Sequence, residues 1–198
     1  METSGKTPEC SGPPPILAIK LSSLGDLFHA LPAVQIIQKT FQAPVDWVTQ
    51  PEYADLVACF GGIRRVIVFP RRNFRAGFWN FARALRRHRY GYILDFQGLL
   101  KSALVSRLAR GEVRVGPSFA REGTRLFYSR LAGPPRRDRH ALEECLDFAE
   151  ALGADRGEGR PIFPFRFPPF VIPAEAPRPW IAVSPFTRWS SKNWPLRH

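Results

Sequence analysis

The segment at residues 16–32 constrains the fold of this chain more than any other. An apolar run opens it, a turn of small residues follows, and a helix-like pattern begins directly after that turn. Buried parallel strands have such apolar runs, and open α/β sheets bind ligands in the loops beyond the carboxyl ends of their strands. Ser22, Ser23 and Gly25 therefore predict a close approach of backbone to ligand. Asp26 predicts a carboxylate at the mouth of the same crevice.

A second interpretation of these residues involves no ligand. Ser, Asp and Gly are the residue types that ordinary helix starts prefer, so Ser23 and Asp26 also fit a simple helix cap. The segment by itself leaves both interpretations open.

Strand-like and helix-like segments alternate from this point onward. The expected strands are residues 16–20, 45–49, 65–69, 92–96 and 113–115. Pro32 is expected to kink the first helix or to restart it. The expected helices are residues 26–41, 52–60, 78–89, 99–110 and 140–152. Such alternation predicts an α/β fold, in which a parallel sheet carries helices on both faces.

The chain is expected to divide into four parts. Residues 1–15 are polar, contain three consecutive prolines and are expected to be a disordered tail. Residues 16–160 are expected to form the α/β lobe, and residues 161–179 hold seven prolines, which is a linker composition. Residues 180–198 open with a new strand-like run. One strand cannot form a domain, so we expect the chain to be cut just inside a second lobe, with this run loosely held.

Charge and cysteine content limit the partners and the compartment. The 29 basic and 17 acidic residues give a net charge of +12, which predicts an anionic partner: nucleic acid, an acidic membrane surface or a phosphorylated substrate. A generally basic proteome would explain the same charge. Cys10, Cys59 and Cys145 form no CxxC pair, which favours a reducing compartment and argues against zinc. No apolar run approaches ~20 residues and no signal peptide is recognisable, so we expect a cytoplasmic protein.

Four segments carry residue types that suit a transfer reaction. The first two are K-x-S-S-x-G-D-x-x-H-x-L-P-A at residues 20–33 and D-x-Q-G-L-x-K-S at residues 95–102. The other two are Arg121-Glu122 with Phe127-Tyr128, and the segment from Thr187 through Lys192 to Pro195. In this order, and over residues 16–195, they resemble the family 9 glycosyltransferases, specifically the lipopolysaccharide heptosyltransferase I branch of that family.

The resemblance implies a fold and an activity. The fold would be a Rossmann-like parallel sheet, the acceptor-binding first lobe of a two-lobe, B-type glycosyltransferase. The reaction would move heptose from ADP-heptose onto Kdo-lipid A in lipopolysaccharide inner-core synthesis, with inversion at the sugar carbon. ADP-heptose is then the donor substrate, and no cofactor and no metal are expected. The second lobe would begin at residue 180 and bind the nucleotide sugar.

The resemblance also implies where the protein acts and what it lacks. We expect a monomer in peripheral contact with the cytoplasmic face of the inner membrane, and no nucleic acid as partner. The family's second lobe carries a D-T-G-x-x-H segment that does not occur in these 198 residues. We therefore expect this chain to bind acceptor and, by itself, to transfer heptose poorly.

Individual residue roles follow from the same resemblance. Asp26 is the expected base on the acceptor hydroxyl, ionised but weak at a helix amino terminus. Lys192, beside Thr187, is the expected partner of the leaving diphosphate. No D-x-D pair occurs, so no catalytic metal is expected. The expected acceptor-binding residues are Ser22, Ser23, Gly25, His29, Arg71, Arg72, Arg75, Gln97, Lys101 and Arg121.

Several of these residues have ordinary alternatives. Lys192 taken alone fits a surface lysine, and His29 fits a capping or packing histidine as well as a partner of Asp26. Phe78 and Trp79 fit either the core of the lobe or contact with lipid acyl chains. A solvated helix face would explain Arg83, Arg86, Arg87 and Arg89.

Two rival functions remain open at this point. The arginines also fit a nucleic-acid-binding protein, although they cluster in one segment and no recognition motif for nucleic acid occurs. The second rival is a non-catalytic lobe that only binds acceptor. A transfer assay separates this second rival from the enzyme.

Overall fold

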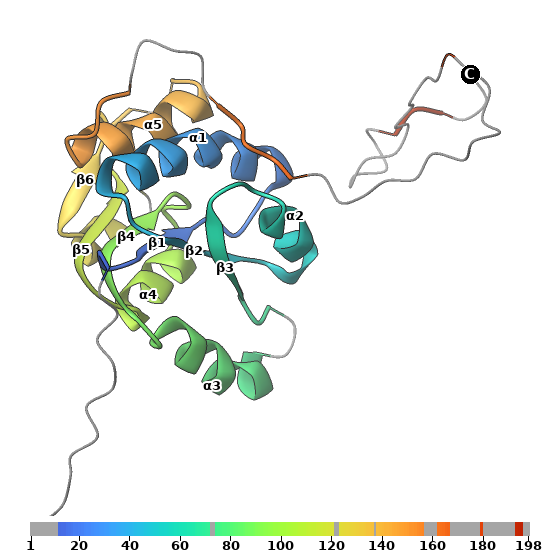
Figure 1. The fold of residues 1–198 in the computed structure, drawn as a ribbon, viewed down its shortest axis with the longest axis vertical. Helices are drawn as coiled ribbons and strands as arrows, with labels where there is room; N and C mark the ends of the chain where they lie inside the picture. The colour runs from blue at the N-terminus through green and yellow to red at the C-terminus, as the bar shows by residue number, and fades with distance from the viewer. Residues whose placement is uncertain are drawn as a thin grey trace, which may run out of the picture. The chain divides into compact units, whose positions relative to one another are not determined.

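Six parallel strands form one sheet in the computed structural model (Figure 1). The structure describes residues 12–71, 74–120, 123–136, 138–156, 162–166, 179 and 193–195. The strands are β1 (Ile16–Ile19), β2 (Val45–Thr49), β3 (Ile63–Val68), β4 (Arg89–Asp95), β5 (Arg110–Pro117) and β6 (Arg130–Ala132). Their order is β3-β2-β1-β4-β5-β6, and all five neighbouring pairs are parallel. The expected α/β class is confirmed.

Helices cover both faces of this sheet. They are α1 (Leu24–Phe41), α2 (Ala54–Ala58), α3 (Phe74–Leu85), α4 (Leu100–Leu108) and α5 (Ala141–Ala151), with 3-10 turns η1 (Pro51–Tyr53) and η2 (Thr124–Phe127). One core cluster holds buried residues of α1, α2 and α5, and the other holds buried residues of α3 and α4. Figure 1 shows α1 and α5 together on one side of the sheet and α3 and α4 on the other.

Strand β1 lies at the centre because its side chains are apolar in both directions. Ile16 and Ala18 pack into the cluster under α1 and α5, whereas Leu17 and Ile19 pack into the cluster under α3 and α4. All four are fully buried. Alternate strand residues point to opposite faces, so a continuous apolar run is what a doubly covered strand requires.

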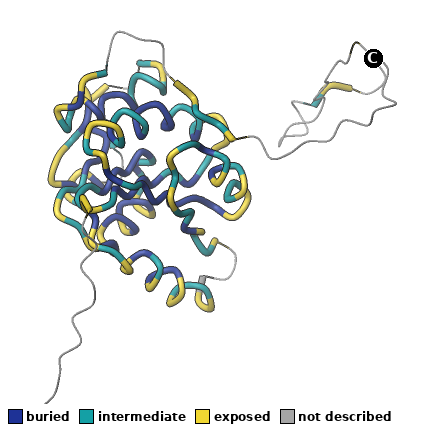
Figure 2. Tube along the Cα trace, in the orientation of Figure 1, coloured by how far each residue is buried: buried dark blue, intermediate teal, exposed yellow. Residues whose placement is uncertain are grey.

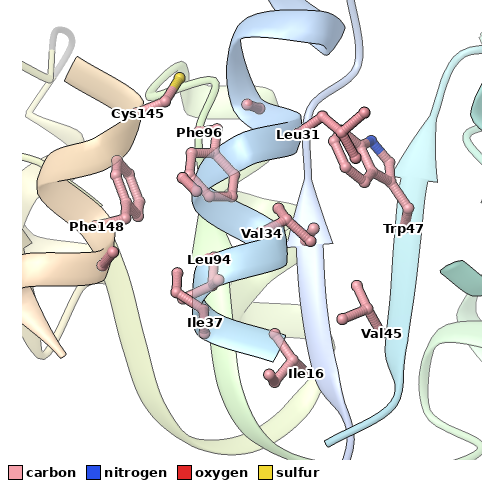
Figure 3. Packing of buried hydrophobic residues seen from close by; sticks show 14 of the residues in the cluster. Ile16, Leu31, Val34, Ile37, Val45, Trp47, Leu94, Phe96, Cys145 and Phe148 are labelled. Atoms are coloured by element: carbon pink, nitrogen blue, oxygen red, sulfur yellow. The ribbon is translucent and has the colours of Figure 1, made fainter. Parts of the chain in front are cut away.

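The larger cluster joins α5 to the sheet through aromatic side chains. Figure 3 shows Phe148 of α5 facing Phe96, which directly follows β4, and their ring centroids are 4.3 Å apart. On the other side of α1, Leu31 lies beside Trp47 of β2 in the same cluster. The carboxyl ends of β1 and β4 are thereby fixed beneath α1 and α5.

Helix α1 runs through Pro32 without a break. The expected restart at Pro32 is therefore wrong, because the proline is buried within the helix and its neighbours anchor it to the core. Strand β6 was not expected at all. It has three residues, only one of them buried, so its sequence carries no strand periodicity.

The ends of the lobe differ from the expected boundaries. Gly91 donates a backbone hydrogen bond to the Pro15 carbonyl, so ordered contacts begin before residue 16. At the other end, Phe165 forms an isolated antiparallel bridge with Phe60. The chain divides into two compact units, Met1–Arg166 and Phe167–His198. Residues 1–11 of the expected tail (1–15) and the expected strand at 180–184 lie outside the described residues.

Burial follows the same layers. Figure 2 shows the strands and the inner sides of the helices as buried, while the outer side of α3 is largely exposed. The sheet order reverses between β1 and β4, because β2 and β3 lie to one side of β1 and β4 to β6 lie to the other. In open α/β sheets this reversal marks the place where ligands bind.

Candidate functional site

The loops after β1 and β4 meet at the point where the strand order reverses. Ile19 and Asp95 are register partners at the ends of these strands. The loop after β1 leads into α1, and the loop after β4 leads into α4. Residues from both loops therefore face one crevice at the carboxyl edge of the sheet.

Asp26 lies in the first turn of α1, at the edge of this crevice. Its Oδ2 accepts hydrogen bonds from the Ser23 backbone nitrogen at 2.8 Å and from the Ser23 hydroxyl at 2.9 Å. Its Oδ1 accepts no hydrogen bond from the described part of the chain. The carboxylate thus caps the helix with one oxygen and keeps the other for a ligand, so the capping and functional interpretations are compatible.

The pKa of Asp26 lies below its ordinary value. Burial of the carboxyl raises its pKa. The Ser23 hydrogen bonds and the nearby charges of Lys20 and His29 together lower the pKa by more than burial raises it. The carboxylate is consequently ionised at neutral pH and is a weak base. It suits a reaction in which the acceptor hydroxyl becomes acidic late, during bond formation.

Gln97 joins the two loops. Its Oε1 accepts hydrogen bonds from the backbone nitrogens of Leu21 at 3.1 Å and Ser22 at 3.3 Å. From the other loop, the Lys20 ammonium donates to the Phe96 carbonyl at 2.9 Å. The loop that carries Asp26 is therefore held in place by the loop that carries Gln97. Sequence reasoning assigned Lys20 no role, and its place at the start of the first motif was the available signal.

Asp95 shapes the second loop from beneath. It is fully buried, and its Oδ1 accepts from the backbone nitrogens of Gln97 at 3.0 Å and Gly98 at 3.1 Å. Its Oδ2 accepts from the Tyr128 hydroxyl at 2.7 Å. Burial raises the pKa of Asp95, although the hydrogen bonds from Tyr128 and the loop act against that rise. Asp95 and Tyr128 are thus supports of the loop, not groups that face a ligand.

A recess of about 90 Å³ lies between α1, the β4 loop and α5. It is far smaller than a ligand pocket of about 300–1,000 Å³, so it forms the inner end of a site. The sequence predicted Asp26 and Gln97 at one crevice, and both line this recess. The other lining residues are Lys20, His29, Phe96, Phe119, Ala141, Glu144, Cys145 and Phe148. The contribution of α5 had no signal in the sequence, because it depends on how α5 packs against α1.

His29 follows Asp26 by one helical turn and reaches the same recess. Its ring centroid is 5.3 Å from that of His140. The His140 Nδ1 accepts a hydrogen bond from the Leu142 backbone nitrogen at the start of α5. The Nδ1 of His29 is buried and has no hydrogen-bond partner among the described residues. His29 therefore carries a buried polar atom without a hydrogen-bond partner among the described residues, one helical turn after Asp26.

The predicted basic residues lie at the same edge but outside the recess. Arg71 follows β3 and donates to the Gln50 side chain at 3.3 Å, with Glu52 at 3.7 Å. Arg75 is exposed in the first turn of α3, and Lys101 is exposed in the first turn of α4. Four predicted site residues lie outside the described residues: Arg72, Arg121, Thr187 and Lys192.

Comparison with known proteins decides the family. Residues 78–198 match the family model described as glycosyltransferase family 9 (heptosyltransferase). The chain belongs to glycosyltransferase family 9. The resemblance seen in the sequence is thereby confirmed.

Curated relatives in this family are lipopolysaccharide heptosyltransferases 1. The Escherichia coli K12 enzyme is 31% identical over 92% of this chain and 61% of its own length. The Pseudomonas aeruginosa enzyme is 29% identical over 91% of this chain and 54% of its own length. The chain thus spans between about half and three fifths of the length of these two relatives.

Solved structures of the family share the fold. The Escherichia coli heptosyltransferase WaaC with ADP-2-deoxy-2-fluoro heptose is 32% identical, with a TM-score of 0.65 over 74% of this chain and 50% of that one. Escherichia coli ADP-heptose lps heptosyltransferase II, at 20% identity and a TM-score of 0.56, shows the fold alone. The first unit of this family 9 chain therefore has the architecture of a B-type glycosyltransferase lobe.

Across the described ranges, no three His, Cys, Asp or Glu side chains gather closely enough to hold a metal ion. Metal independence stays a prediction. In the same part of the chain, no helix is both long and apolar enough to cross a bilayer.

Proposed function

We propose that this chain carries the acceptor half of a heptosyltransferase that moves heptose from ADP-heptose to Kdo-lipid A in lipopolysaccharide inner-core synthesis. The observation that carries the proposal is the ionised Asp26 carboxylate, which caps α1 with one oxygen and leaves the other unbonded within the described residues. Membership of family 9 supports the reaction class. The relative with ADP-2-deoxy-2-fluoro heptose supports the donor.

The proposed step is a displacement at the anomeric carbon. Asp26 accepts the proton of the acceptor hydroxyl as the oxygen of that hydroxyl bonds to the sugar carbon. The bond from that carbon to the diphosphate breaks, ADP leaves with the electron pair, and the configuration inverts. Lys192 and Thr187 are proposed to stabilise the charge on the departing diphosphate, which is the usual role of positioned cations and donors. No metal takes part in this proposal.

Lys20, Gln97 and His29 are proposed to complete the acceptor side. Gln97 and Lys20 hold the Asp26 loop against the β4 loop, so the carboxylate keeps its direction toward the crevice. The guanidinium groups of Arg71 and Arg75 suit the phosphates and carboxylates of the acceptor headgroup. Arg72 and Arg121 are assigned the same role by the family resemblance. The protein is proposed to work as a cytoplasmic monomer in peripheral contact with the inner membrane.

The second candidate function is acceptor binding without transfer. It is favoured by one observation: the candidate groups that the structure describes, among them Asp26, His29 and Gln97, line one recess of one lobe. The remaining contacts to the donor are expected from the part of the relatives that this chain does not match.

One experiment separates the two candidates. The 198-residue chain, alone and joined to the carboxyl-terminal half of the Escherichia coli relative, is incubated with ADP-heptose and a Kdo-lipid A analogue. Product is followed by mass spectrometry and ADP release. We expect acceptor binding by both proteins and heptose transfer by the joined protein. Acceptor binding without any transfer by a folded joined protein would favour the non-catalytic lobe, and binding by neither would refute both.

A further inference from the structure

The segment between α2 and the end of β4 concentrates positive charge. Residues 56–94 contain nine arginines and no aspartate or glutamate. Arg64 and Arg65 pair with the buried Asp46 of β2, and Arg89 pairs with Glu112 of β5. Part of this charge is thus neutralised by the fold itself.

The arginines of α3 and of the turn after it are not neutralised in this way. Arg83, Arg86 and Arg87 are exposed and make no ion pair with any described residue. Arg110, at the start of β5, is also exposed and likewise has no ion pair within the described ranges. Four guanidinium charges on one surface without carboxylates beside them require an anionic partner or solvent.

These four arginines surround an open hollow of about 820 Å³. Trp79 of α3 lies at the same hollow and is 74% exposed, an unusual position for the largest aromatic side chain. Arg65 also lines the hollow, and its Nε is buried without a hydrogen-bond partner among the described residues. A second hollow of about 540 Å³, lined partly by the same arginines, continues the surface past His88. Burial and the charges of Arg64 and Arg65 lower the pKa of His88, in keeping with a strongly positive environment.

We propose that this surface, the arginine face (Trp79, Arg83, Arg86, Arg87 and Arg110), binds the anionic headgroups of a phospholipid bilayer. Arginines bind phosphate oxygens through two parallel hydrogen bonds, and clusters of basic residues beside a membrane are attracted to anionic lipids. A basic amphipathic helix with an outward tryptophan lies in the plane of the interface, with the indole at the headgroup boundary. The outer side of α3 is largely exposed in Figure 2.

The inference rests on the proposed function, and α3 links the two edges of the sheet. Arg86, Arg87 and Arg110 lie at the amino ends of β4 and β5, whereas the crevice lies at the carboxyl edge. Arg75 opens α3, and Arg83 lies eight residues further along the same helix, about 12 Å away at 1.5 Å per residue. The proposed acceptor is itself anchored in a bilayer by its acyl chains. A helix that binds headgroups along its length would therefore hold Arg75, and the crevice edge near it, at the level of the acceptor headgroup.

Vesicle binding tests the inference without any heptose chemistry. The chain is mixed with vesicles of phosphatidylethanolamine and phosphatidylglycerol, which contain no lipopolysaccharide precursor, and bound protein is measured by flotation. The patch variant is Arg83→Gln, Arg86→Gln, Arg87→Gln. The matched control is Arg125→Gln, Arg136→Gln, Arg166→Gln, which removes the same charge from exposed positions outside the arginine face. Each arginine near a charged membrane contributes roughly fivefold in affinity, so the patch variant should bind on the order of 100-fold more weakly.

The outcomes are distinct. Binding that falls with salt, falls strongly in the patch variant and changes little in the control supports the arginine face, and Trp79→Ala should weaken binding further at high salt. If both triple variants lost vesicle binding equally, the proposal would be overturned, because the net charge of the chain would then explain the binding. Absence of binding to phosphatidylglycerol vesicles would overturn the proposal as well. It would also be overturned if the patch variant lost tight binding to duplex DNA but bound vesicles as well as wild type does. Vesicle binding by the chain, together with no heptose transfer by the folded joined protein, would refute the proposed function and leave the arginine face intact.

Discussion

The side-chain oxygen of Gln97 lies 3.1 Å from the backbone nitrogen of Leu21, although the two residues are 76 positions apart. This hydrogen bond, with its neighbour to Ser22, joins the loop after β4 to the loop that carries the candidate base. Gln97→Ala leaves the buried Leu21 nitrogen without its partner, and we expect unfolding free energy to fall by about 1–3 kcal/mol. Transfer by the joined protein should fall as well, because Asp26 loses its support.

Gln97→Glu is the matched variant. A glutamate oxygen accepts hydrogen bonds in the same position, so stability measured by urea unfolding should change less than for alanine. If alanine and glutamate were equally harmless to transfer, Gln97 would be a surface residue without a positioning role.

Asp26→Asn tests the base. Asparagine keeps the size of the side chain and still caps a helix, so acceptor affinity and fold should hardly change. Turnover should fall by roughly 10²–10⁴-fold, as expected for a lost general base. Asp55→Asn is the control, since Asp55 is an exposed acid in the first turn of α2. Full turnover of the Asp26→Asn protein would leave Asp26 as a cap only.

The pH dependence of Asp26 follows from its lowered pKa. A carboxyl whose pKa is lower in the folded than in the unfolded chain stabilises the fold above the unfolded value, near 3.8, and loses that contribution as pH falls through the folded value. The difference in unfolding free energy between wild type and Asp26→Asn should therefore be constant from pH 8 to about pH 5 and shrink below pH 3.8. Urea titrations across this range measure it. A difference that disappears near pH 6 would contradict the lowered pKa.

The central strands could be predicted from the sequence, and the edges could not. Residues 45–49 are predicted as a strand with the observed bounds, because Val45, Trp47, Val48 and Thr49 are β-branched or aromatic residues that favour strands. Strand β3 begins two residues earlier than predicted, at Ile63, because Arg64 and Arg65 pair with Asp46. The charges of Arg64 and Arg65 are neutralised by a residue of another strand. A local sequence pattern contains no information about such a partner.

The candidate site was predictable to the same extent. Asp26 and Gln97 follow the ends of neighbouring parallel strands, so their meeting at one edge follows from the fold class. The support by Tyr128 and the lining by Glu144 depend on where η2 and α5 pack, and periodicity does not determine this. Lys101 belongs to the second motif, yet it lies exposed on α4 and does not line the recess.

Gly25 allows a test of backbone approach to the ligand. A Cβ added at Gly25 would meet no atom of the chain within 4 Å, and alanine is favoured over glycine in a helix by roughly 1 kcal/mol. Gly25→Ala should therefore fold at least as stably as wild type. If the acceptor passes close to this turn, its affinity should nevertheless fall, as measured by calorimetry with a Kdo-lipid A analogue.

Gly98→Ala is the contrasting variant. Gly98 has a φ of +65°, and an added Cβ would lie 2.6 Å from Pro117 Cγ, so this substitution should lower stability itself. Unchanged acceptor affinity in the stable Gly25→Ala protein would show that this turn consists of small residues for reasons other than a close approach of the ligand.

Asp46 is the group whose loss should most destabilise the fold. It is fully buried, it pairs with Arg64 and Arg65, and its Oδ2 accepts from the Tyr90 hydroxyl at 2.9 Å. Asp46→Asn removes the negative charge and leaves two guanidinium groups facing a neutral amide. Breaking such a buried pair costs about 3–5 kcal/mol, whereas Tyr90→Phe removes the hydroxyl that donates to Asp46 and accepts from Arg65, and it should cost about 1–3 kcal/mol.

Urea unfolding of the two variants, with Asp55→Asn as the exposed control, measures this order. Asp46 lies near the amino end of β2, far along the strand from the crevice, so acceptor affinity of the folded fraction should remain. Because Arg65 also lines the hollow of the arginine face, vesicle binding by folded Asp46→Asn should stay the same or strengthen. If Asp46→Asn were as stable as Asp55→Asn, Arg64 and Arg65 would be satisfied by solvent, and their pairing with Asp46 would contribute little to stability.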